Sequence, residues 1–196
     1  MSSPARPLRN EPAVEAAFDA VPPEQIAEII DGELHVQARP GRRHARSASR
    51  LIGDLGAPFD RGRGGPGGWV ILIEPELHLG PRPDKLVPDL AGWRRERLPD
   101  ALGEEADDGH FDLAPDWVCE VISASTERVD RVKKMRIYRR ERVGHVWLLN
   151  PHAQTLESYR LDGERWTLLD TFEGDARVRA EPFEAIELEL AALWER

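Results

Sequence analysis

The feature that most constrains this chain is a charged residue inside an apolar run. Residues 116–122 read DWVCEVI, and the alternation of a β-strand places Glu120 between Val118 and Ile122 on one face. An isolated buried carboxylate is strongly disfavoured, so Glu120 needs a cation, a metal ion or a hydrogen-bond donor. The segment therefore predicts a buried strand that carries a specially paired carboxylate.

A second carboxylate occupies a similar setting 31 residues earlier. In LVPDLAGW, residues 86–93, Asp89 lies between Val87 and Ala91 on its own strand face. Two carboxylates on neighbouring strands repel each other unless a divalent ion neutralises them. Asp89 and Glu120 are therefore the candidate metal ligands.

A basic helix is predicted directly after the second strand, over residues 127–141, ERVDRVKKMRIYRRE. At about 100° per residue, Val132, Met135 and Tyr138 define its apolar arc, and Lys134 lies at the edge of that arc, within reach of Glu120. Two simpler interpretations stay open. Lys134 and Asp130 have the spacing of a surface ion pair, and Glu120 can instead be a structural carboxylate held by an arginine.

These segments together resemble a known family. Asp89 after Pro88, followed by Glu120 in a strand, resembles the PD-(D/E)XK nuclease superfamily. More narrowly, the chain resembles the Uma-type putative restriction endonuclease family through EIIDGEL (28–34), PDLAGW (88–93), PDWVCEVISAST (115–126), the spacing of Asp130, Lys134 and Tyr138, VGHVWLLNP (143–151) and LESYRL (156–161). The resemblance implies Mg²⁺- or Mn²⁺-dependent hydrolysis of phosphodiester bonds in DNA, often by a homodimer.

One position departs from the superfamily pattern. The lysine expected two residues after the second acid is replaced by Ile122, and the resemblance implies that Lys134 takes its place. The predicted catalytic residues are therefore Asp89, Glu120 and Lys134. Glu28 and His44 are additional candidates by resemblance, although Glu28 can equally be a solvated carboxylate beside a hairpin turn.

The remaining patterns predict an α/β (α+β) domain with a restriction-endonuclease-like core, in which a central mixed sheet is flanked by helices and the site lies at the open edge of the sheet. Asp31-Gly32 is a hairpin signal, and the strand-like run 69–79 is broken at Pro75. Residues 1–20 are expected to form a flexible arm or a short helix, and residues 21–196 a single domain. Asp84 is expected in a loop.

Charge is unevenly distributed along the chain. The net charge is -9, yet residues 127–142 hold eight basic and three acidic side chains. Such an acidic protein is not a general nucleic-acid coater, and we expect its basic side to carry the site. Arg42, Arg46 and Arg131 are candidates for phosphate contacts. The amphipathic helix that holds Arg42 and Arg46 can also simply present a solvated face.

Other functions find little support in the sequence. A single cysteine, Cys119, excludes an intramolecular disulfide, and the absence of a signal peptide or apolar span predicts a cytoplasmic protein. The acids at 104, 105, 107 and 108 lack the EF-hand spacing of a calcium site. Two alternatives to an active nuclease remain: a catalytically inactive nucleic-acid-binding module on the same fold, and a structural or protein-interaction domain.

Overall fold

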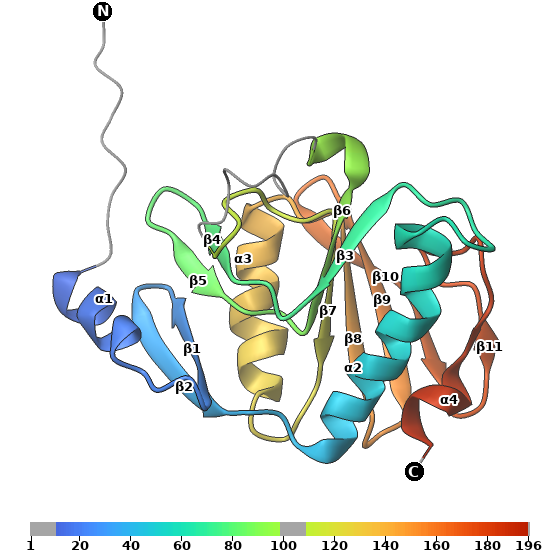
Figure 1. Ribbon diagram of the computed structural model, residues 1–196, viewed down its shortest axis with the longest axis horizontal. Coiled ribbons are helices and arrows are strands. Elements are labelled where there is room, and N and C mark those ends of the chain that lie inside the picture. Colours follow the sequence, from blue (N-terminus) through green and yellow to red (C-terminus); the bar gives the residue numbers. More distant parts are fainter. Residues whose placement is uncertain (1–10, 99–108, 196) are drawn as a thin grey trace, which may run out of the picture.

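A six-stranded mixed sheet is the largest element of the computed structural model, which describes residues 11–98 and 109–195 (Figure 1). Strands β7 and β8 are parallel, and the other neighbouring pairs are antiparallel. A mixed sheet with helices on both faces is the predicted fold. The order across the sheet is β10 (Arg165–Glu173), β9 (Thr155–Asp162), β8 (His145–Asn150), β7 (Trp117–Val121), β6 (Leu90–Arg94) and β3 (Trp69–Ile73).

The alternation predicted for β7 divides the core between the two faces of this sheet. Trp117 and Cys119 pack with α2 (Arg42–Leu55) and α4 (Leu190–Trp194) on one face. Val118 packs on the other face with α3 (Met135–Arg140). Cys119 is fully buried, as a small core residue in a strand should be.

A smaller antiparallel sheet lies on the far side of α3, so that this helix is enclosed between two sheets (Figure 1). Its order is β2 (Glu33–Ala38), β1 (Gln25–Ile30), β5 (Asp84–Leu86) and β4 (Leu77–Leu79). The predicted turn between β1 and β2 is confirmed, because Asp31 and Gly32 have φ angles of 53° and 81°, the signature of a tight hairpin turn.

The remaining elements are short. A π-helical turn, η1 (Gly56–Asp60), extends α2, and a 3₁₀ turn, η2 (Arg95–Arg97), follows β6. Strands β11 (Arg177–Val178) and β12 (Leu188–Glu189) form a two-stranded sheet near the C-terminus.

The N-terminal segment contains a helix, α1 (Pro12–Asp19), where either an arm or a short helix was predicted. This helix is attached to the small sheet by Lys85, whose Nζ lies 2.7 Å from Glu15 Oε2 and 4.3 Å from the centre of the Phe18 ring. Residues 1–10, and the acids at 104–108, lie outside the described residues.

Two local predictions were wrong, for Asp84 and for Val132. Asp84 begins β5 instead of lying in a loop, and its buried carboxylate accepts the Asp31 N–H at 2.6 Å. The predicted basic helix opens as a π-helix, η3 (Val129–Lys134), before α3 begins. That change of pitch leaves Val132, predicted to lie on the apolar arc, 52% exposed.

Among the described segments, no helix is both long and apolar enough to cross a membrane.

Candidate active site

Lys134 is the centre of a buried cluster of charges. Its side chain is only 2% exposed, and its Nζ lies 2.8 Å from Glu28 Oε1, 3.4 Å from both Glu120 oxygens and 3.5 Å from Asp130 Oδ1. Glu28 belongs to the small sheet and Glu120 to the large sheet, so the lysine joins the two sheets. The predicted reach of Lys134 to Glu120 is confirmed, and its pairing with Asp130 is buried and not on the surface.

Glu120 is held by the helix that follows it. The hydroxyl of Tyr138 donates a hydrogen bond of 2.5 Å to Glu120 Oε1, and Lys134 contacts both oxygens. The interpretation in which an arginine holds Glu120 is therefore wrong. Burial raises the pKa of Glu120 well above its usual range, and nearby carboxylates add to this effect while Lys134 opposes it.

Asp89 stands immediately before β6. Because Leu90 pairs with Cys119 across the antiparallel strands, the same register brings Asp89 beside Glu120. Asp89 Oδ2 accepts the backbone N–H of Val121 at 2.7 Å, and Oδ1 lies 3.1 Å from His44 Nε2. These two contacts fix the carboxylate at the junction of β6, β7 and α2.

His44 links α2 to this carboxylate. Burial lowers the pKa of His44, but the hydrogen bond and charge of Asp89 outweigh burial and leave the pKa raised. Its Nδ1 is buried and has no hydrogen-bond partner among the described residues. His44 therefore has one nitrogen bonded to Asp89 and one that meets no hydrogen-bonding group within residues 11–98 and 109–195.

Glu28 is the member of the cluster that the small sheet supplies, from β1. Its side chain is 2% exposed, and Oε1 also accepts the Val87 N–H at 2.9 Å. A solvated hairpin carboxylate is thus excluded. The cluster holds more carboxylates than cationic groups: Glu28, Asp89, Glu120 and Asp130 face Lys134 and His44.

A cavity of about 400 Å³ opens above the cluster. Its walls include the start of α2, the end of β7 and the loop after β7, and its charged lining residues are Arg39, His44, Glu74, Asp89, Glu120, Asp130 and Lys134. β6 and β7 are inner strands, with β3 and β10 at the edges. The cavity therefore lies where two inner strands, β6 and β7, meet the margin of the sheet.

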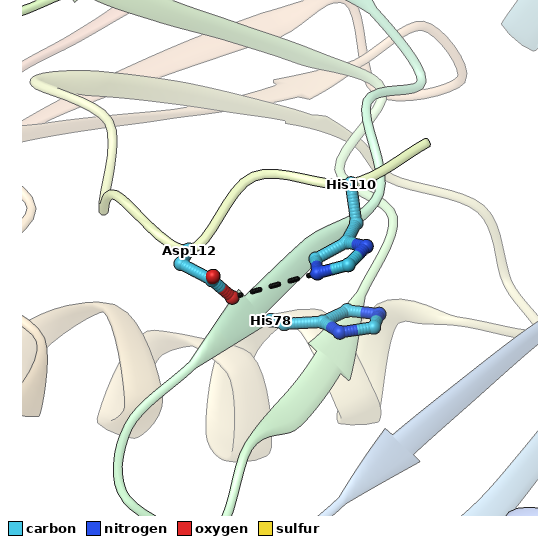
Figure 2. A group of neighbouring side chains, drawn as sticks. All are labelled: His78, His110 and Asp112. Carbon is cyan, nitrogen blue, oxygen red and sulfur yellow. Dashed lines mark ion pairs between the residues drawn. The ribbon is translucent and has the colours of Figure 1, made fainter. Parts of the chain in front are cut away.

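The carboxylates that line this cavity suit Mg²⁺ better than a metal ion that needs three or more protein ligands. Within residues 11–98 and 109–195, the only group of three or more histidine, cysteine or acidic side chains whose ligand atoms lie within 4.8 Å of one another is His78, His110 and Asp112 (Figure 2). The cavity instead offers a pair of carboxylates from adjacent strands. Mg²⁺ usually binds through one or two carboxylates and keeps several waters.

The three candidate arginines differ in their surroundings. Arg131 is already engaged, since its guanidinium lies 2.5 Å from Glu157 Oε1 and 2.9 Å from Glu127 Oε1. Arg46 donates to the backbone carbonyl of Glu195 at 2.8 Å. Arg42 is exposed in the first turn of α2, whose N-terminal residues line the cavity.

The raised pKa of Glu120 predicts a pH-dependent stability. Between about pH 4.5, where the unfolded carboxylate titrates, and the higher pKa of the folded state, the folded protein binds more protons. The unfolding free energy of the metal-free protein should therefore fall as pH rises through this window. In Glu120→Gln the fall should be shallower, by about 1.4 kcal/mol for each unit of pKa shift removed.

This prediction is checked by urea unfolding between pH 5 and 8 with EDTA present. The matched control is Glu127→Gln, an exposed acid at the start of the same helical segment. It should follow the wild-type pH profile. Equal profiles for Glu120→Gln and the wild type would contradict a raised pKa for Glu120.

Comparison with known proteins supports a nuclease. The family model described as Uma2, putative restriction endonuclease, matches residues 15–192. A solved structure, a putative nuclease belonging to DUF820 from Anabaena variabilis ATCC 29413, is 21% identical, with a TM-score of 0.73 over 92% of this chain and 96% of that chain. At this identity the likeness shows a shared fold. No curated protein matches the sequence. Because the family model covers nearly the whole length, the chain belongs to the Uma2 family of putative restriction endonucleases.

Proposed function

We propose that the chain is a metal-dependent endonuclease that hydrolyses phosphodiester bonds in DNA within the cavity above Lys134. One observation carries the proposal: Asp89, immediately before β6, and Glu120, near the end of the adjacent β7, line one cavity, with a buried lysine against Glu120. This is the arrangement that a two-carboxylate, one-lysine nuclease needs. Membership of a family described as restriction endonucleases supports the same reaction.

Asp89 and Glu120 are the residues that would hold Mg²⁺ or Mn²⁺, and the backbone carbonyl of Val121 is a further candidate because Val121 lines the cavity. The ion would lower the pKa of its bound water and stabilise charge on the phosphate. The excess of carboxylates in the cluster favours a cation there. The Val121 N–H and His44 hold Asp89 in place for this role.

Lys134 acts in this proposal as a fixed positive charge. Burial alone would lower its pKa, but Glu120, Glu28 and Asp130 raise it well above its usual range. Lys134 is therefore protonated at neutral pH and cannot accept a proton from water. It would orient Glu120 and favour its ionised form against the effect of burial, and its charge would stabilise the negative charge that builds on the phosphate.

DNA would approach over the start of α2. The N-terminal end of a helix attracts phosphates through its unpaired N–H groups and its dipole, and Pro40 and Gly41 bring that end to the cavity wall. Arg42 is the most accessible of the candidate phosphate contacts. Arg46 and Arg131 would have to leave or share their present partners to serve.

A second candidate function is nucleic-acid binding without cleavage. It is favoured by Ile122, which occupies the position of the usual lysine and is a buried core residue, 4% exposed. Calorimetric titration with Mg²⁺ and Mn²⁺ separates the two. An active site should bind an ion in the wild type and lose it in Asp89→Asn combined with Glu120→Gln. Failure of the wild type to bind either ion would favour the inactive module.

The cytoplasmic location and the homodimer stay predictions.

A further inference from the structure

A second group of metal-ligand side chains lies outside the cavity, on the small sheet. His78 belongs to β4, while His110 and Asp112 lie on a segment that runs alongside it. Two backbone hydrogen bonds hold these segments together: the His78 N–H donates to the Phe111 carbonyl at 2.9 Å, and the Phe111 N–H donates to the Glu76 carbonyl at 2.8 Å. The backbone therefore fixes the histidines side by side.

The two imidazole rings are stacked, with their centres 3.8 Å apart and their planes inclined by 18°. The carboxylate of Asp112 lies beside them, with its Oδ1 3.6 Å from His110 Nε2 (Figure 2). One ligand atom from each of the three residues lies within 4.8 Å of the others. Nitrogen and oxygen donors that converge in this way suit Zn²⁺, which binds imidazole and carboxylate at about 2.0–2.2 Å.

Glu76 gives a second, independent indication of a metal site. Its Oε1 lies 2.6 Å from His78 Nε2. Histidines that bind metals commonly donate their other ring N–H to a carboxylate, which fixes the ring and its tautomer. With Nε2 held by Glu76, Nδ1 is the His78 nitrogen left to face an ion. Asp112, whose side chain is 82% exposed, can rotate to close the ligand set.

We propose that His78, His110 and Asp112 form a transition-metal site that takes Zn²⁺, with Glu76 as the carboxylate that orients His78. Three protein ligands leave a fourth tetrahedral position for water. The ion would fasten residues 110–112 to β4. This site is separate from the proposed nuclease centre and does not depend on it: none of its residues lines the cavity, and its two nitrogen donors favour zinc over magnesium.

The test uses the full chain with the nuclease carboxylates removed, as Asp89→Asn with Glu120→Gln, so that zinc bound in the cavity does not interfere. Zinc binding is measured by calorimetry, and Co²⁺ absorption is used as a probe of tetrahedral nitrogen coordination. We expect one Zn²⁺ per chain in this background. His78→Ala or His110→Ala should abolish it, and Glu76→Gln should weaken it about tenfold. His152→Ala, which changes an exposed histidine elsewhere, should leave it unchanged.

Thermal unfolding guards against variants that lose binding because they lose the fold. Without metal, His78→Ala and His110→Ala should still unfold cooperatively, whereas added zinc should raise the melting temperature of the parent alone. Three results would overturn the proposal. Zinc could still bind to both the His78→Ala and the His110→Ala variants, it could fail to bind once Asp89→Asn and Glu120→Gln are introduced, or it could bind only at millimolar concentration.

Discussion

Asp89→Asn should reduce the Mg²⁺-dependent nicking of plasmid DNA by about two to three orders of magnitude, the usual loss when a group that stabilises transition-state charge is removed. The substitution keeps the shape of the side chain. The amide oxygen can still accept the Val121 N–H that Asp89 Oδ2 accepts at 2.7 Å, but the negative charge that would hold the ion is gone. Glu120→Gln should have the same effect for the same reason.

Glu74→Gln is the matched control for both substitutions. Glu74 lines the same cavity, but its carboxylate pairs with Arg39 at 3.0 Å and contacts neither Lys134 nor His44 among the contacts described above. Its removal should change the nicking rate by less than about threefold, within the range of an exposed ion pair. Equal losses in all three variants would indicate a general effect of cavity charge instead of two specific ligands.

Lys134→Ala should lower the free energy of unfolding by about 3–5 kcal/mol, because removing one partner of a buried ion pair leaves uncompensated charge. Glu28, Glu120 and Asp130 would then face one another without their common cation. The raised pKa of Lys134 also indicates that the folded state stabilises the charged lysine. A lysine whose folded pKa lies above the unfolded value near 10.5 contributes its full stabilisation at neutral pH and loses it only as pH rises through the folded pKa.

Urea unfolding at pH 7 measures this loss. Lys133→Ala is the control, because Lys133 precedes Lys134 in the chain but forms a partly exposed pair with Glu33 at 3.0 Å. It should cost no more than about 1 kcal/mol. Adding Glu28→Gln to Lys134→Ala should recover part of the stability by removing one of the opposed charges. Similar costs for the two lysine variants would contradict a buried, shared cation.

Much of the fold and half of the site follow from local patterns. The apolar alternation around Glu120 predicts a buried strand and a carboxylate that needs a partner. The helical arc predicts that Lys134 can reach Glu120, and that contact is present. The hydrogen bond from Tyr138 to Glu120 was not predicted, because Tyr138 was expected only as part of the apolar arc. Asp31-Gly32 predicts the hairpin that presents Glu28. These predictions succeed because each depends on residues within a few turns of helix or one strand.

The failures concern contacts between segments distant in the chain. Nothing near Glu28 indicates that its carboxylate will meet a lysine more than a hundred residues later and become buried. The sequence around Asp84 predicts a loop, and it is the pairing of the three-residue β5 with β1 and β4 that makes the segment a strand.

The predicted basic segment does contribute to the site, because Asp130 and Lys134 line the cavity, but much of its charge is neutralised in the fold. In the folded chain, Lys133, Arg136 and Arg140 pair with acids of the small sheet: Glu33, Asp31 and Asp84. A sum of charges along the sequence cannot register this neutralisation, because the acids come from another sheet. These ion pairs attach η3 and α3 to the small sheet, so their basic side chains are not free to bind phosphates. The start of α2 is therefore the better candidate for DNA contact.

The most direct test of the account is nicking of supercoiled plasmid by the wild-type protein in Mg²⁺, Mn²⁺ or EDTA, with Asp89→Asn beside it in each condition. The account predicts conversion of supercoiled to nicked and linear DNA in Mg²⁺ or Mn²⁺, no conversion in EDTA, and a strongly reduced rate in Asp89→Asn. Cleavage that continues in EDTA, or that Asp89→Asn retains at the wild-type rate, would contradict a metal-dependent nuclease centre at the cavity above Lys134.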